Sequence, residues 1–218
     1  MPTKSPRPST RKAGKAGSGR KGKSFERDIA GRIRDAFKTT GDPAFADLEE
    51  RHLFRTPQSG GGYDKGDITK RHAELSIAFP WTVECKCNEG FPLLEQLMQN
   101  RNHRLFQKSW EQVCDEAAYN KEYPLLVWKL NLLPAMCAYP RANAMNVLDA
   151  NLSETALASF WYASDLTIIL FDDFVSAAVH AGLRYLRAYQ GSELKDQYIF
   201  DFYSSGPSAL CLPGFIKK

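Results

Sequence analysis

The chain has 218 residues, of which 43% are hydrophobic, and a formal net charge of +4. This length suffices for one sizeable core, and no apolar stretch is long enough for a membrane span or a secretory signal. The five cysteines are odd in number and form no Cys-x-x-Cys pair, which argues against a disulfide framework and favours reduced thiols in the cytoplasm.

The N-terminal segment has a large excess of positive charge. Residues 1–23 contain eight of the 29 Lys and Arg residues and no acid, which leaves 21 basic against 25 acidic residues in the rest. The segment is also rich in Gly, Pro, Ser and Thr, which predicts a disordered tail over residues 1–22. It is either a nucleic-acid-binding arm or a solvated terminus. The arm is favoured because the rest of the chain has no positive excess.

The first predicted helix covers residues 24–38. Its apolar stripe recurs at every fourth position, at Phe25, Ile29, Ile33 and Phe37. Ser24 is the predicted N-cap. Glu26 lies beside the stripe, where its side chain could turn toward the edge of a sheet.

Strands and helices alternate along the remainder of the chain. Strands are predicted near residues 52–57, 66–71, 81–87, 124–130, 166–171 and 197–203. Helices are predicted over residues 92–100, 104–119 and 151–163, and from Asp172 or Asp173 to about residue 189. This order indicates an α/β fold with a mixed sheet flanked by helices.

The most informative motif is Glu84-Cys85-Lys86, in the strand that follows Gly66-Asp67-Ile68. Side chains alternate along a strand, so Glu84 and Lys86 share one face while Val83 and Cys85 share the apolar face. On neighbouring strands, Asp67, Glu84 and Lys86 would form a site for a hard divalent cation and a phosphate.

A Glu-x-Lys triplet alone has low specificity, because a chain of this length should contain about one by chance. A second triplet, Glu193-Leu194-Lys195, lies in a polar segment and is interpreted as a solvated turn. Glu84 and Lys86 differ because they interrupt an apolar strand, where a charge is costly unless it is paired or bound to metal. The alternative for them is a structural ion pair on a solvated sheet face.

Further polar residues accompany this motif. Arg55 and Ser59 precede three consecutive glycines, residues 60–62, which allow close approach to a ligand or simply a turn. Gln112 flanks the apolar face of the helix over residues 104–119. The following residues, in this order, resemble the motifs of PD-(D/E)xK nucleases: Glu26, Arg55, Ser59, Asp67, Glu84-Cys85-Lys86 and Trp110-Glu111-Gln112.

The resemblance covers about residues 20–131 and is greatest to Holliday junction resolvase-like proteins, including those encoded by phages. One departure is Gly66, which occupies the position where the family usually has proline. The resemblance implies a restriction-endonuclease-like core over residues 23–135. It also implies that Asp67 and Glu84 bind Mg²⁺, that Glu26 completes the metal site, and that Lys86 assists the attacking water. Mn²⁺ should be able to replace Mg²⁺.

The predicted function is magnesium-dependent hydrolysis of DNA, with branched DNA as the expected substrate. The predicted DNA contacts are Arg55, Ser59, Gln112 and Lys23. Residues 136–218 have no counterpart in the resemblance and are predicted as a C-terminal α/β extension that packs on or completes the core. We expect a homodimer in the cytoplasm (the host cytoplasm for a phage protein), without a membrane partner.

Two alternatives stay open. One is a nuclease that acts on nicked, linear or single-stranded DNA. The other is a DNA-binding recombination or packaging factor that has kept the fold without cleavage, although the intact Asp67, Glu84 and Lys86 argue against it.

Overall fold

The computed structural model describes residues 16–57, 65–99, 103–140, 160–162 and 166–191. Several predictions concern other parts of the chain and lie outside the described residues. They are the basic segment before Ala16, Ser59 with the three glycines, most of the helix over 151–163, the Glu193 triplet and the strand over 197–203.

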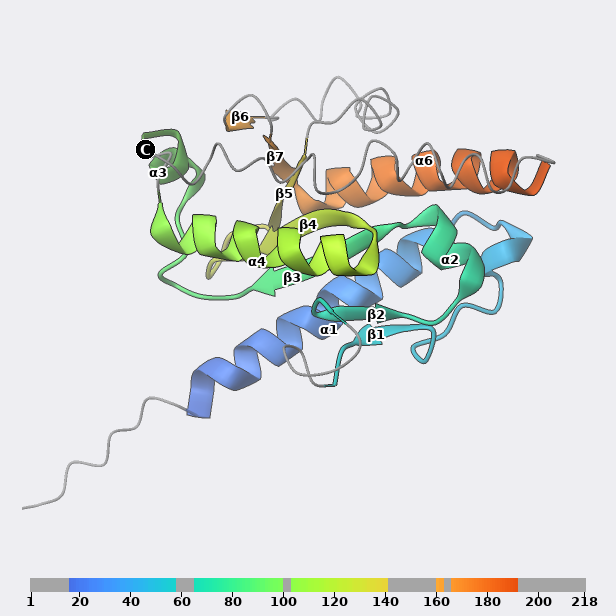
Figure 1. Ribbon diagram of the computed structural model, residues 1–218. Helices are drawn as coiled ribbons and strands as arrows, with labels where there is room; N and C mark the ends of the chain where they lie inside the picture. The colour runs from blue at the N-terminus through green and yellow to red at the C-terminus, as the bar shows by residue number, and fades with distance from the viewer. Residues whose placement is uncertain (1–15, 58–64, 100–102, 141–159, 163–165, 192–218) are drawn as a thin grey trace, which may run out of the picture.

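Helices and short strands alternate as expected (Figure 1). The helices are α1 Ala16–Lys38, the 3-10 turn η1 Pro43–Phe45, α2 Ala73–Ala78, α3 Leu94–Gln99, α4 Arg104–Asn120 and α6 Phe171–Gly191. The strands are β1 Leu53–Arg55, β2 Ile68–Lys70, β3 Trp81–Lys86, β4 Tyr123–Trp128, β5 Met136–Pro140, β6 Phe160–Tyr162 and β7 Leu166–Leu170. Among the described helices, none is long and apolar enough to cross a membrane.

The strands form two sheets. A mixed sheet has the order β3-β4-β5-β7-β6, in which β3 and β4 are parallel and the other pairs are antiparallel. β1 and β2 form a separate antiparallel pair. Because β3 is the outermost strand of the larger sheet, its outer edge is available to the segment that leads into β2. The mixed sheet with flanking helices confirms the predicted restriction-endonuclease-like fold.

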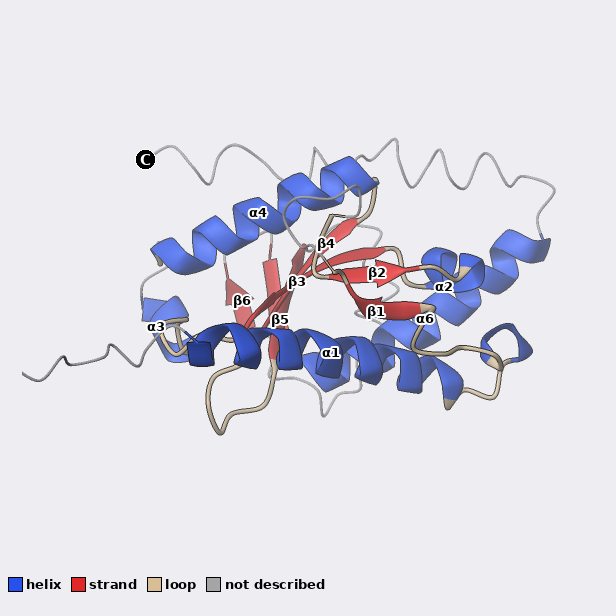
Figure 2. Ribbon diagram, turned by 90° about the horizontal axis from the view of Figure 1, so that it is seen from below, coloured by secondary structure: helices blue, strands red, loops and turns tan. Residues whose placement is uncertain are grey.

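Helices cover both faces of the mixed sheet. Val83 and Cys85 of β3 share one core with the apolar stripe of α1 and with α6. On the other face, Leu126 and Trp128 of β4 pack against α4. Glu84 and Lys86 are paired in register with Leu126 and Trp128, so they point toward the α4 side. Figure 2 shows α1 and α4 on opposite sides, with β1, β2 and β3 between them. The predicted alternation along β3 is therefore confirmed.

Two predicted helix starts were wrong. α1 begins at Ala16, so Ser24 lies inside the helix and is not its N-cap. Lys and Arg have good helix propensity, and extending an existing helix costs far less than nucleating one, so α1 continues into the basic segment. α6 begins at Phe171, which places Asp172 and Asp173 in its first turn rather than at the cap, where they interact favourably with the helix dipole.

A predicted helix end was also wrong, because residues 160–162 form β6. β6 pairs with β7, with Phe160 opposite Ile168, so the strand pairing replaces the predicted end of the helix, whose start at Asn151 lies outside the described residues. Two further elements, α2 and β5, were not predicted from the sequence. α2 has six residues, too few to show a helical period, and β5 ends at Pro140. β5 lies between β4 and β7, so residues 136–140 belong to the same sheet as the Glu84 strand.

The crossing of α2 and α6 depends on Gly182. A Cβ atom at this position would lie 2.1 Å from the carbonyl oxygen of Ala78 and would force the helices apart. We expect Gly182→Ala to lower the free energy of unfolding by about 2–4 kcal/mol, measured by chemical denaturation. Gly31→Ala is the matched control in α1, because the nearest atom there would be the flexible Arg34 Nη2 at 3.7 Å. It should leave stability unchanged or raise it by up to about 1 kcal/mol. An equal loss in both variants would contradict the packing argument.

Candidate active site

Asp67 joins the two-stranded sheet to the outer edge of β3. Its backbone N–H donates to Val83 O at 2.8 Å, and its side-chain Oδ2 accepts from the Cys85 N–H at 2.8 Å. Its carbonyl oxygen accepts from the Thr56 N–H, next to the end of β1, at 2.9 Å. The carboxylate of Asp67 is therefore bonded to the backbone of the motif, between the residues Glu84 and Lys86.

Gly66 explains the departure from the family pattern. Its φ is +88°, and a Cβ atom would lie 3.0 Å from Thr82 Cγ2 and 3.2 Å from Val83 O. Proline fixes φ near −65°, so it cannot adopt this conformation. Glycine is required here because the backbone turns with positive φ while it lies directly against β3.

Glu84 and Lys86 form an ion pair under α4. Glu84 is 3% exposed, and its Oε1 accepts from Lys86 Nζ. Lys86 Nζ also donates to Gln112 Oε1 at 3.1 Å. The two residues therefore form an ion pair, as the alternative interpretation expected. That interpretation also required a solvated sheet face, whereas the face they share is the one on which α4 packs. Gln112, a predicted DNA contact, holds the lysine in this structure.

Glu26 reaches the site from α1. Its Oε2 accepts from Arg55 Nε of β1, and both side chains are largely buried. Arg55, another predicted DNA contact, therefore pairs with a predicted metal ligand. Lys23 lies one turn before Glu26 on α1, and its charge acts on the Glu26 carboxyl group.

Burial and mutual repulsion perturb the carboxyl groups. Burial, followed by the charge of Asp67 and then of Glu116, raises the pKa of Glu84 to about 8, and the Lys86 ammonium only partly offsets this. Burial and the charge of Asp67 also raise the pKa of Glu26, against the opposing effect of Arg55. Perturbed carboxyl groups that act on one another are typical of functional sites.

Glu116 is the site residue that the sequence reading missed. It lies one turn after Gln112 on α4, and its Oε1 accepts from Gln112 Nε2 at 3.1 Å. Its Oε2 is buried and has no hydrogen-bond partner among the described residues. The available signal was the i, i+4 spacing of Gln112 and Glu116, which places them on one face of the helix.

A family model described as "Phage putative PDDEXK endonuclease" matches residues 17–180. The chain belongs to this phage PD-(D/E)xK family. No curated protein and no solved structure gives a significant match. Membership confirms the predicted superfamily and makes the protein a nuclease, with DNA as its substrate.

The carboxylates of the nuclease have the right chemistry for a hard divalent cation. Asp67, Glu84 and Glu26 offer oxygen donors of the kind that Mg²⁺ prefers, and a cation would relieve the repulsion that raises the pKa of Glu84. Within the described ranges, however, no three His, Cys, Asp or Glu side chains are grouped as metal ligands. Two of the three carboxylates instead bond to internal cations, Glu84 to Lys86 and Glu26 to Arg55.

A buried polar network holds β2 against the beginning of β3. Lys70 Nζ donates to Phe79 O at 3.0 Å and to Trp81 O at 2.8 Å, and it lies 2.7 Å from Glu122 Oε1. Glu122 Oε2 accepts from Thr82 Oγ1 at 2.8 Å. Burial lowers the pKa of Lys70. The network supports β2, which begins directly after Asp67, at the opposite end of β3 from Lys86.

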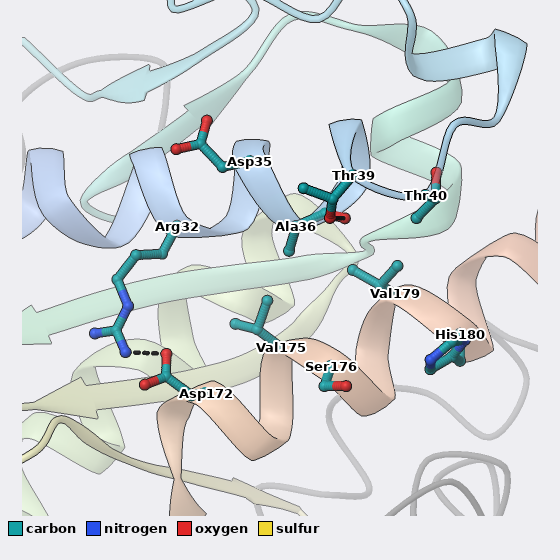
Figure 3. Close-up of a pocket in the computed structure, with 10 residues that line it drawn as sticks. All are labelled: Arg32, Asp35, Ala36, Thr39, Thr40, Asp172, Val175, Ser176, Val179 and His180. Carbon is teal, nitrogen blue, oxygen red and sulfur yellow. Dashed lines mark hydrogen bonds and ion pairs between the residues drawn. The ribbon is translucent and has the colours of Figure 1, made fainter.

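The pocket in Figure 3 is not part of this site. It has a volume of about 500 Å³ and is lined by α1 and α6, where Arg32 reaches across to Asp172. Asp67, Glu84 and Lys86 are not among its lining residues. The arginine also lies over the Phe171 ring, at 5.1 Å from its centroid, so these contacts belong to the packing of the two helices.

The raised pKa of Glu84 gives stability a defined pH dependence. The folded-state pKa is above the unfolded value, so the fold favours the protonated form and this contribution is complete below about pH 4.5. It is lost as pH rises toward about 8, because the unfolded chain ionises first. In metal-free buffer, we expect the stability of Glu84→Gln relative to the native protein to increase by about 1–3 kcal/mol from pH 5 to pH 8.5.

Denaturation curves across this pH range measure the difference. The control is Glu111→Gln, which removes an exposed carboxylate on α4 and should show no such trend. A stability difference for Glu84→Gln that stays constant with pH would show that the Glu84 carboxyl group is not perturbed by the fold.

Proposed function

We propose that this nuclease is a magnesium-dependent endonuclease that cuts branched DNA. The observation that supports it most is the bond from the Cys85 N–H to Asp67 Oδ2. This bond places the Asp67 carboxylate beside the backbone that carries Glu84 and Lys86. Two potential metal ligands, Asp67 and Glu84, and the ammonium group of Lys86 are thus all attached to β3.

Asp67 and Glu84 would hold the metal ion, and Glu26 would join them on leaving Arg55. When bound, Mg²⁺ (or Mn²⁺ in its place) supplies a Lewis acid that stabilises charge on phosphate oxygens during hydrolysis. Metal binding also needs ionised carboxylates, so the raised pKa of Glu84 favours binding at neutral to alkaline pH.

Lys86 would orient the attacking water or a phosphate oxygen. Its two bonds, to Glu84 and Gln112, use two of the three N–H groups of the ammonium, and its side chain is 27% exposed. Arg55, Ser59 and Lys23 would contact the DNA backbone near the cut. Lys23 is exposed on α1, one turn from Glu26, which is consistent with this role.

Branched DNA and a homodimer form the finer part of the proposal. A four-way junction needs two cuts, and a two-fold dimer presents two sites related like the arms of the junction. The basic N-terminal segment would add affinity that is independent of sequence, and the enzyme would act in the host cytoplasm.

Cleavage assays test the catalytic assignment. The purified protein should cut a four-way junction in Mg²⁺ and do so better than a flap, a duplex or single-stranded DNA. Glu84→Ala and Lys86→Ala should each reduce the rate by about a thousandfold or more, because each removes several kcal/mol of barrier lowering. DNA affinity and folding should be largely retained.

The control is the second Glu-x-Lys triplet, whose variants Glu193→Ala and Lys195→Ala should cut normally. A Lys86→Ala protein within tenfold of the native rate would rule out the assignment of Lys86. A preference for flaps or linear DNA would favour the alternative nuclease, and native protein that binds DNA without cutting any substrate would favour the non-cleaving factor.

The basic segment can be tested separately through salt dependence. Deleting residues 1–15 removes Lys4, Arg7, Arg11, Lys12 and Lys15 and leaves α1 complete. Each phosphate contact contributes about 0.9 to the slope of log affinity against log salt, so the slope should decrease by roughly two to four. Cleavage at low salt and saturating enzyme should persist. An unchanged slope would mean that the folded domain alone contacts the DNA.

A further inference from the structure

A chain of hydrogen bonds connects Glu84 to a carboxylate on α4. Lys86 Nζ donates to Glu84 Oε1 and, at 3.1 Å, to Gln112 Oε1. Gln112 Nε2 donates in turn to Glu116 Oε1 at 3.1 Å. Glu116 is thus connected to Lys86 through the amide of Gln112. It can act on the lysine in this way without contacting the DNA.

The direction of the amide is the important property of this chain. A glutamine amide has an accepting and a donating end of nearly the same shape, and only its neighbours decide which end points where. A carboxylate can only accept, so Glu116 requires the NH₂ group of Gln112 to face it. The carbonyl oxygen then faces the ammonium of Lys86. In the opposite orientation, two donors would face each other.

The position of Glu116 makes it suitable for this task. It lies one turn from Gln112, and its neighbours Val113 and Ala117 are buried against the sheet, which holds this part of α4 in place. Its Oε2 is buried without a partner among the described residues. Its charge also raises the pKa of Glu84, so the two carboxylates repel each other in the folded protein.

We propose that Glu116 is a positioning residue, which fixes the amide of Gln112 and thereby holds the ammonium of Lys86 beside Glu84. A lysine side chain has four rotatable bonds, and acceptors on two sides restrict its nitrogen to one place. The catalytic consequence rests on the proposed role of Lys86, whereas the positioning itself does not.

Kinetics with a charge-swapped pair test the catalytic consequence. Glu116→Ala should lower kcat about tenfold and leave KM within twofold, because the lysine is displaced while DNA binding is not. The double variant Gln112→Glu, Glu116→Gln keeps the net charge. The new carboxylate at position 112 still accepts from Lys86, and the new amide at position 116 donates to that carboxylate. It should recover kcat to within about threefold of the native value. Asp115→Ala, at an exposed position of the same helix outside the nuclease-like motif, should behave as the native protein.

Chemical modification tests the positioning without any catalysis. Acetylation of Lys86 by an amine-reactive ester, followed by mass spectrometry, should be at least threefold faster in Glu116→Ala than in the native protein and should return toward the native rate in the swapped pair. The exposed Lys108 serves as the internal reference. This measurement keeps its meaning even for a protein that cuts no DNA.

Three outcomes would overturn the proposal. Unchanged Lys86 acetylation in Glu116→Ala would show that Glu116 does not act on the lysine. Unchanged kcat in an active enzyme would show that its position has no catalytic role. Loss of Mg²⁺ affinity in Glu116→Ala, measured by calorimetry and not recovered in the swapped pair, would make Glu116 a metal ligand instead.

Discussion

The attachment of Asp67 to the outer edge of β3 is the contact on which the site depends. One residue uses its backbone N–H, its carbonyl oxygen and its side chain to join the β1–β2 pair to the mixed sheet. The same bonds place its carboxylate beside the Glu84 strand. Fold and candidate site are therefore linked here, because a shift of the strand pair would move the Asp67 carboxylate. Gly66 follows from this constraint, since only glycine fits between the turn and β3.

This arrangement concentrates negative charge at a buried position. Burial and the charge of Asp67 raise the pKa of both Glu26 and Glu84, and the charge of Glu116 adds to the effect on Glu84. Arg55 and Lys86 offset part of this effect in the structure as it stands. A divalent cation would offset more of it. Burial and repulsion of these carboxylates destabilise the folded protein, and a bound cation would reduce this cost. Metal binding at this position should therefore be favourable.

The two flanking helices have different roles. α1 contributes Glu26 to one side of the β3 edge and extends at its N-terminus into basic residues, of which Lys21 lies 3.5 Å from Glu89 and Lys23 is exposed. α4 covers the other side and contributes Gln112 and Glu116 to the lysine. Under the proposed function, α1 faces the DNA backbone while α4 organises the catalytic group. The site is therefore built between two layers that the mixed sheet holds apart.

The sequence by itself determined the face of β3 that bears Glu84 and Lys86, the apolar stripe of α1 and the membership of the nuclease superfamily. These are consequences of local periodicity and of motif spacing, which one chain displays directly. It did not determine β5 or β6, because pairing with distant strands decides them. It also did not show α2, which is too short for a helical period, or the start of α1 at Ala16, where the helix propagates into basic residues. Only the tertiary structure placed Arg55 on Glu26 and Gln112 on Lys86 and brought Glu116 into the site. These partners are far apart in the sequence or appear as ordinary charged helix residues, and only the fold decides which of their atoms meet.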